Sequence, residues 1–312
     1  MTVAVLNGLI RPLLEGRLPD WVEPRWFLST KELLALAPEA EIGWFDTYDL
    51  PARAESARRA VKLRWMNTLG AGVEELPLDV FRTNGVILTN GAGINAVTIA
   101  EYAVMGMLVM AKGYRQVIRA ADRQEWLTDS PGKAELQGSK ALVIGAGAIG
   151  GGIAERLAPF GVAVTKVRRH PGEGELGPDD WRPHLGEFDW VIVTAPSTAE
   201  TRHMIGEAEL AAMKATAVLM NFARGDLVDQ EALVAALKGR RIGGAWLDVT
   251  DPEPLPPGHE LWTVENAHIS MHLSGRAQNM MFIRSAERFL ANLDRWHRGE
   301  PLHHVVDLAA GY

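Results

Sequence analysis

The stretch from residue 140 to 167 constrains the fold of this chain more than any other. An apolar strand candidate, residues 141–144, runs into Gly145-Ala-Gly-Ala-Ile-Gly150, and a helix is expected over 151–160 with its C-cap at Gly161. A second strand is expected over 162–167. In such a unit the first glycine permits a tight turn, the second lets the backbone approach a pyrophosphate, and the third lets helix pack on strand. Since the helix N-terminus also offers free N–H groups to phosphates, the unit predicts a dinucleotide site rather than a glycine-rich turn without ligand.

The remaining pattern alternates strands and helices on both sides of this unit. Further strands are expected over 190–194, 217–221, 242–248 and 267–270, which predicts a parallel, doubly wound sheet. Before it, strands over 3–6, 41–45, 63–67 and 86–89 with helices over 30–37 and 54–61 form a smaller α/β unit. One long helix is expected over 95–122. A closing helix over 276–298 is expected to return to the first unit, so the domains predicted are 1–94 plus 276–312, and 95–275.

Composition excludes several classes of function. With 312 residues the chain is long enough for two domains. The 32 basic and 39 acidic residues leave a net charge of −7, so nucleic acid and anionic membranes are not expected partners. The absence of cysteine excludes disulfides, thiolate metal sites and a cysteine nucleophile. The N-terminus lacks a basic leader, and the longest apolar run, 102–111, is far short of the roughly 20 residues of a membrane span. A cytoplasmic location is therefore expected.

Two arginines indicate which dinucleotide is bound. An NAD site usually has a carboxylate at the end of the second strand, about 20 residues after the glycine loop, to accept from the ribose 2′-OH. Here that position carries Arg168 and Arg169, whose guanidinium groups suit a 2′-phosphate. We therefore expect NADP rather than NAD; the alternative is an ordinary solvated basic surface run.

Three further segments follow predicted strand ends, where ligands bind in doubly wound sheets. They are residues 220–225, 245–256 and 268–275. With the glycine loop they carry Asn221-x-x-Arg224-Gly225, Leu247-Asp248-Val249 leading to Glu253-Pro254, and His272. The order and spacing of these motifs resemble those of the D-isomer-specific 2-hydroxyacid dehydrogenases, and the resemblance covers nearly the whole chain. Trp44 and the run Leu69-Gly-Ala-Gly-Val73 are similar to the glyoxylate/hydroxypyruvate reductase branch.

The resemblance implies a fold and an assembly. The expected fold is α/β with two domains, a doubly wound parallel-sheet (Rossmann) nucleotide domain inserted in a smaller flavodoxin-like substrate domain. A homodimer is implied as well, with the helix over 95–122 contributing to it. One departure concerns the local backbone: the family usually has proline before the catalytic histidine, where this chain has Met271.

The chemistry of a 2-oxo acid gives the three catalytic candidates their roles. Reduction delivers hydride to C2 and a proton to the carbonyl oxygen, and histidine is the natural general acid near neutral pH. We assign His272 to this role. Glu253 would pair with its ring, orient it and favour the imidazolium. Arg224 would bind the substrate carboxylate and polarise the carbonyl.

Other residues are assigned to binding. Gly70, Ala71 and Gly72 offer backbone N–H groups for the carboxylate. By resemblance, Asp248 accepts from the nicotinamide carboxamide and Trp44 closes the substrate pocket. The complete expected cofactor set is Gly145, Gly147, Ala148, Ile149, Gly150, Arg168, Arg169, Ala195, Pro196, Thr201, Phe222, Ala223, Arg224, Asp248, His272, Ser274 and Gly275. The substrate set is Trp44, Gly70, Ala71, Gly72, Arg224 and His272.

Structural alternatives exist for several of these residues. Arg224 could serve a structural ion pair, Glu253 an exposed acidic loop, Asp248 a cap or turn, and Trp44 the core. No metal site is expected, because His268 and His272 lie on a strand running into a loop and not on one helix face.

The leading hypothesis is therefore NADPH-dependent reduction of a small 2-oxo acid, glyoxylate or hydroxypyruvate, to an (R)-2-hydroxy acid, the chirality coming from the resemblance. A nucleotide-sensing regulator on the same scaffold is the main alternative, since fold does not dictate function. Another NADP reductase sharing only the nucleotide domain is a third.

Overall fold

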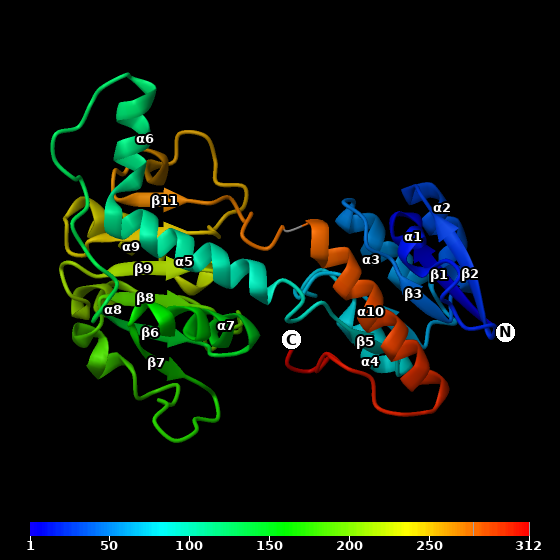
Figure 1. Ribbon diagram of the computed structural model, residues 1–312. Coiled ribbons are helices and arrows are strands. Elements are labelled where there is room, and N and C mark those ends of the chain that lie inside the picture. Colours follow the sequence, from blue (N-terminus) through cyan, green and yellow to red (C-terminus); the bar gives the residue numbers. More distant parts are fainter. Residues whose placement is uncertain (277, 312) are drawn as a thin grey trace. The chain divides into compact units, whose positions relative to one another are not determined.

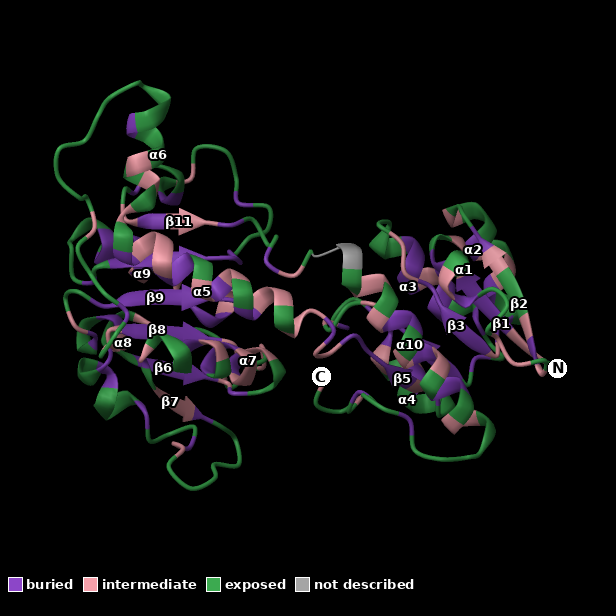
Figure 2. Cartoon of the chain, viewed as in Figure 1, coloured by how far each residue is buried: buried purple, intermediate pink, exposed green. Residues whose placement is uncertain are grey.

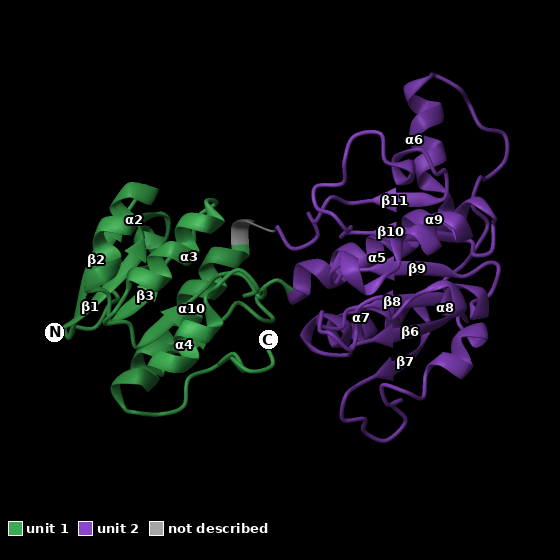
Figure 3. Cartoon of the chain, turned by 180° about the vertical axis from the view of Figure 1, so that it is seen from behind, with its two compact units in different colours: residues 1–95, 277–312 green, residues 96–276 purple. Residues whose placement is uncertain are grey.

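The chain forms two compact α/β units, which are described separately. A computed structural model describes residues 1–276 and 278–311 (Figure 1). One unit comprises Met1–Asn95 and Ala277–Tyr312, the other Ala96–Arg276 (Figure 3). The expected boundaries were 94/95 and 275/276, and the expected range 276–312 includes residues 277 and 312, which lie outside the described residues.

The first unit is a parallel five-stranded sheet in the order β2-β1-β3-β4-β5. Its strands are β1 (Thr2–Asn7), β2 (Val22–Phe27), β3 (Ile42–Trp44), β4 (Trp65–Asn67) and β5 (Ile87–Thr89). Its helices are α1 (Arg11–Leu14), α2 (Thr30–Leu36), α3 (Leu50–Arg59), α4 (Leu78–Asn84) and α10 (Gln278–His297). Strand β2 was not expected. It carries Pro24 and charged residues, a composition that only an edge strand tolerates.

The closing helix covers one face of this sheet. Ala286, Phe289 and Leu293 of α10 share a buried cluster with Trp44 and Trp65 of the strands. Leu33, Ala57 and Phe81 of α2, α3 and α4 cover the other face. Figure 2 shows the resulting buried layer along the strands. The C-terminal helix is therefore part of the first unit, as the sequence pattern predicted.

The second unit is a parallel six-stranded sheet in the order β11-β10-β9-β8-β6-β7. Its strands are β6 (Lys140–Ile144), β7 (Ala163–Val167), β8 (Trp190–Val193), β9 (Val218–Asn221), β10 (Gly244–Leu247) and β11 (Ala267–Ile269). Helices α5 (Ala96–Lys112) and α7 (Ala148–Leu157) pack on one face, and α8 (Glu207–Ala212) and α9 (Gln230–Lys238) on the other. Because β7 and β8 lie on opposite sides of β6, the strand order reverses there, and sheets of this kind bind ligands at such a reversal.

The single long helix expected over 95–122 is wrong. The structure has two helices, α5 and α6 (Tyr114–Asp122), bent by 72° at Gly113. Gly113 is left-handed (φ 60°), and a Cβ there would come within 2.9 Å of the Gly132 nitrogen. A glycine in this conformation ends a helix. Among the described residues no single helix has the length and apolarity of a membrane span; only the bent pair α5–α6 reaches both, by length and composition alone.

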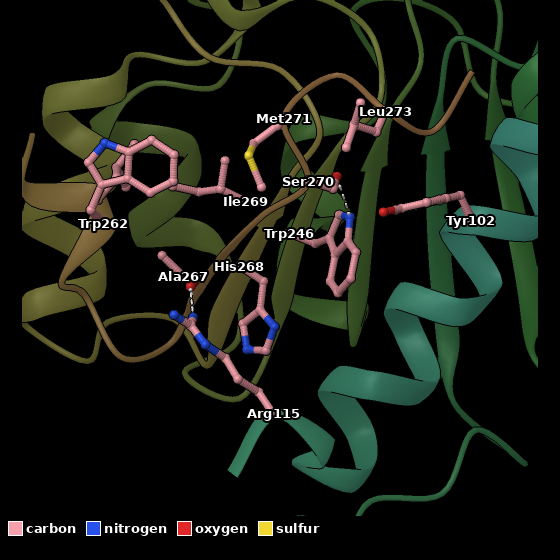
Figure 4. A pocket seen from close by; sticks show the side chains of 11 residues that line it. Tyr102, Arg115, Trp246, Trp262, Ala267, His268, Ile269, Ser270, Met271 and Leu273 are labelled. Carbon is pink, nitrogen blue, oxygen red and sulfur yellow. Dashed lines mark hydrogen bonds between the residues drawn. The ribbon is translucent and has the colours of Figure 1, made fainter. Parts of the chain in front are cut away.

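A pocket of about 360 Å³ opens beside edge strand β11 (Figure 4). The ring of His268 lies in it, stacked on Trp246 with ring centroids 5.6 Å apart. Burial, followed by the positive charges of Arg115 and Arg119, lowers the pKa of His268 to about 4. The folded protein therefore holds this histidine neutral.

This neutral histidine makes the stability pH-dependent. Between pH 6.5 and 4 the unfolded chain protonates His268 and the folded chain does not, so stability falls as the pH is lowered through that window. For a partly exposed ring we expect a loss of about 1–2 kcal/mol in the free energy of unfolding. Urea unfolding at several pH values checks this. His268→Gln should show a shallower acid decline than the unmodified protein, and parallel declines would contradict the assignment.

Candidate active site

The glycine loop lies at the carboxyl end of β6. Gly145 has φ 94°, and a Cβ on it would come within 2.4 Å of the Ala195 Cα atom. A Cβ on Gly150 would come within 2.7 Å of the Gly145 carbonyl oxygen, whereas a Cβ on Gly147 would meet nothing within 4 Å. The first glycine thus makes the tight turn, the second leaves open space for a ligand, and the third allows close packing of helix on strand. Ala148, Ile149 and Gly150 form the first turn of α7, where backbone N–H groups lack helical partners.

A second loop follows β8 beside the first. Ala195 is the second residue after the strand, and its close approach to Gly145 brings the two loops together. The Thr201 hydroxyl donates to the Pro196 carbonyl oxygen (2.7 Å) and accepts from the Thr198 N–H (2.8 Å). These bonds close the loop, so Ala195, Pro196 and Thr201 are held at the strand-order reversal.

The two arginines after β7 have acidic neighbours that sequence reasoning missed. The Arg168 Nε lies 3.2 Å from a Glu175 oxygen, and Arg169 lies 3.6 Å from Glu200. Residue 176 folds back on β7 through two backbone hydrogen bonds with residues 166 and 168, which places Glu175 at the strand end. Seven residues lie between Val167 and Glu175, and no local sequence signal marks this return.

Arg224 stands on a turn after β9 that is fastened by Asn221. The Asn221 side chain donates to the Arg224 carbonyl oxygen (2.8 Å) and accepts from the Ala223 N–H (3.0 Å). Phe222 and Ala223 are buried, whereas Arg224 is half-buried. A Cβ on Gly225 would come within 2.1 Å of the Thr250 backbone, so glycine lets this turn lie against the loop after β10.

Glu253 and His272 form a hydrogen-bonded pair. The His272 Nδ1 lies 2.8 Å from one Glu253 oxygen, and the other accepts from the Thr250 N–H at 3.1 Å. Partial burial raises the pKa of Glu253, but the His272 hydrogen bond and the charges of His272 and Arg224 outweigh it, so the pKa lies below its usual value. The carboxylate is therefore ionised when it holds the ring. With Nδ1 engaged, Nε2 is the ring nitrogen left for proton transfer.

The turn that carries His272 is held by Asp248. Its carboxylate, 3% exposed, accepts from the Ser270 hydroxyl at 2.8 Å and from both the N–H and the hydroxyl of Ser274. Its carbonyl oxygen accepts from the His272 N–H. Asp248 thus holds a turn, which was the structural alternative for this residue. Its expected contact with the nicotinamide carboxamide stays a prediction. Gly275 follows this turn and is half-buried.

In the first unit, the expectation for Trp44 is wrong. Its side chain is 1% exposed and packs on Phe289 of α10, with ring centroids 5.0 Å apart. The indole N–H donates to Asp46. Trp44 belongs to the core, because α10 covers the strand face on which its ring lies, and its side chain is not presented to a substrate.

Gly70, Ala71 and Gly72 lie in the loop after β4. In the part of the chain that the structure describes, the N–H groups of these three residues donate to no protein acceptor. Asp46, which the sequence did not single out, accepts from Leu69 at the start of the loop. Within the described ranges, no three His, Asp or Glu side chains are grouped as metal ligands would be.

The backbone at Met271 explains the departure from proline. Met271 and His272 both have φ 54°, in the left-handed region. Proline is restricted to φ near −65° and cannot adopt this turn. Two successive left-handed residues are strained, and such strain persists only where surrounding bonds enforce it, here those of Asp248.

Met271→Pro should therefore destabilise the protein, by about 1–3 kcal/mol, because the turn must rearrange. Met271→Gly, which relieves the left-handed strain, should change the free energy of unfolding by less than about 1 kcal/mol. Urea unfolding of the two variants side by side tests this. Equal stability of the proline and glycine variants would show that the left-handed turn is not required.

Comparison with known proteins places this geometry in a family. Residues 104–274 match the family described as D-isomer specific 2-hydroxyacid dehydrogenase, NAD binding domain. Glyoxylate reductase of Korarchaeum cryptofilum is 34% identical over 259 residues, which is 80% of this chain and 78% of that protein. Glyoxylate reductase/hydroxypyruvate reductase of Mus musculus is 34% identical over 253 residues, 77% and 76% of the two chains.

A solved structure agrees over the whole length. The D-isomer specific 2-hydroxyacid dehydrogenase of Xanthobacter autotrophicus Py2, in complex with NADPH and MES, is 25% identical. It superposes with a TM-score of 0.80, covering 100% of this chain and 99% of that one. Family match, sequence identity and fold coincide with the glycine loop and the strand-end turns, and the chain belongs to the D-isomer-specific 2-hydroxyacid dehydrogenase family.

Proposed function

We propose that this protein reduces small 2-oxo acids, of the glyoxylate and hydroxypyruvate type, to (R)-2-hydroxy acids with NADPH. The His272–Glu253 hydrogen bond carries the proposal, because it presents an oriented proton donor at the strand ends of a dinucleotide-binding fold. The names of the Korarchaeum and mouse relatives support the substrate class.

The residues of this chain divide the chemistry between them. Bound NADPH supplies the hydride. His272, held at Nδ1 by ionised Glu253, gives the proton on Nε2 to the carbonyl oxygen as negative charge develops there. Arg224 polarises the carbonyl and pairs with the carboxylate. The free N–H groups of Gly70, Ala71 and Gly72 bind the carboxylate.

The cofactor binds at the glycine loop in this proposal. The open space at Gly147 fits a backbone approach by a pyrophosphate, and the N-terminus of α7 fits its charge. Arg168 and Arg169 would bind the 2′-phosphate, although Glu175 and Glu200 compete for them. The Xanthobacter relative was solved with NADPH, which supports NADP.

Exposed apolar residues support the expected homodimer. Val97 and Met105 of α5 and Ile118 of α6 are 36%, 41% and 44% exposed. Apolar side chains on one helix pair favour burial against a second copy.

Removing the proton donor should slow turnover strongly. We expect His272→Ala to lower kcat by roughly 10²–10⁴-fold, since general acid catalysis contributes about that factor. NADPH oxidation is followed with glyoxylate, hydroxypyruvate, pyruvate and phenylpyruvate. Glu253→Gln should lower kcat less, because the ring keeps a hydrogen-bond acceptor but loses the charge. If the native protein turns over none of these acids, the nucleotide-sensing alternative is favoured; a fully active His272→Ala would exclude His272 as the acid.

Cofactor preference tests the two arginines separately from the chemistry. The double variant Arg168→Ser/Arg169→Ser should raise KM for NADPH by roughly 10–100-fold, since two charge-assisted contacts are lost. KM for NADH should change less than about threefold, because NADH has no 2′-phosphate. Steady-state kinetics with both cofactors provide the measurement. A native protein that uses NADH as well as NADPH would refute the assignment.

A further inference from the structure

Asp46 collects donors from three elements of the first unit. One carboxylate oxygen accepts from the Trp44 indole N–H (2.7 Å) and the Leu69 N–H (2.6 Å). The other accepts from the Thr68 hydroxyl (2.8 Å) and an Arg53 nitrogen (3.1 Å). These donors come from β3, α3 and the loop after β4. Two donors on each oxygen match the roughly four acceptor sites of a carboxylate.

The charge of this cluster is balanced internally. The side chains of Asp46 and Arg53 are only 18% and 10% exposed, and their ion pair is shielded from water. A buried carboxylate is costly unless it is paired and hydrogen-bonded, and here both conditions are met. Because Arg53 neutralises it, Asp46 can stand beside an anion-binding loop without repelling the anion.

The loop that Asp46 holds has its carbonyl groups turned toward the protein. The Gly70 carbonyl oxygen accepts from the Gly91 N–H, and the Ala71 carbonyl oxygen accepts from the Asn90 side chain, both at 2.8 Å. The Leu69 carbonyl oxygen lies so close to Gly91 that a Cβ there would be 1.8 Å from it. In a trans peptide the N–H points opposite to the preceding carbonyl. The next three N–H groups, of Gly70, Ala71 and Gly72, therefore point away from residues 90 and 91.

From this geometry we infer that Asp46 is a positioning residue for substrate binding, which acts through the loop 68–72. It fastens Thr68 and Leu69, the two residues before the three free N–H groups, and so sets the direction in which those groups face a carboxylate. The inference rests on the proposed function, in which these N–H groups bind the carboxylate of the 2-oxo acid.

Asp46→Asn tests this with little change in size. The amide nitrogen introduces a donor where two donors converge, so one side of the cluster must release the loop. Asp49→Asn is the matched control: it removes a charge three residues away, at the N-cap of α3, where asparagine caps equally well. We expect Asp46→Asn to raise KM for glyoxylate and the inhibition constant of oxalate by roughly tenfold or more. The value of kcat should stay within about threefold and Kd for NADPH should not change, whereas Asp49→Asn should alter none of these.

Two milder variants at Thr68 test the same contact with less risk of a folding defect. Thr68→Val removes one donor to Asp46 and should weaken oxalate binding, and Thr68→Ser should restore it. Hydrogen exchange of the amides in residues 69–72 gives a readout without turnover, and exchange should be faster in Asp46→Asn than in Asp49→Asn.

The outcomes separate the two proposals. If the native protein reduces no 2-oxo acid, the proposed function fails, and oxalate affinity with amide exchange still decides the role of Asp46. If the native protein is active but Asp46→Asn matches Asp49→Asn in KM, oxalate affinity and exchange, the role of Asp46 is overturned.

Discussion

Parallel strands buried on both faces are the constraint on which the rest of this structure depends. In both sheets the paired strands are parallel and helices cover both faces, so the faces are apolar and polar side chains of the central strands lie at the strand ends. In the second unit the glycine loop, Arg224, Asp248 and the turn of His272 all follow strand ends. The strand order reverses beside β6, which is where sheets of this kind bind ligands.

Two carboxylates that are shielded from water, one in each unit, each hold a loop in place. Asp248 fastens the strained turn of His272, and Asp46 fastens the loop that precedes the free N–H groups of residues 70–72. In each case a carboxylate within two residues of a strand end accepts several hydrogen bonds from a neighbouring loop. Such a group is costly to bury unless every acceptor is used, so the loop around it is held in one conformation. Rigid support of this kind is what a site needs when it must hold small ligands in one orientation.

Sequence patterns predicted the strands of the second unit, but they missed one edge strand, one helix bend and the burial of Trp44. The expected strands of the second unit all exist, because buried parallel strands are short apolar runs. Strand β2 escaped notice because an edge strand tolerates proline and charge. The bend at Gly113 was missed because apolar periodicity continues across it, and only the packing of Gly113 against residues 131 and 132 requires the left-handed residue. Trp44 was assigned to a substrate by resemblance, and its burial was not foreseen because its cover, α10, comes from the other end of the chain.

The sequence by itself determined the dinucleotide loop, the strand-end segments with Arg224, Glu253 and His272, and the family these motifs resemble. Those features are local: glycine spacing and residue type at a strand end carry their own chemical meaning. The sequence also predicted that Glu253 pairs with the His272 ring, and the structure shows that hydrogen bond. The tertiary structure alone decided that Glu175 returns to Arg168 and that Asp46 holds the loop of residues 68–72. Arg168 and Glu175 meet only because residue 176 folds back on β7, and Asp46 meets Leu69 only once folding has closed the chain between them.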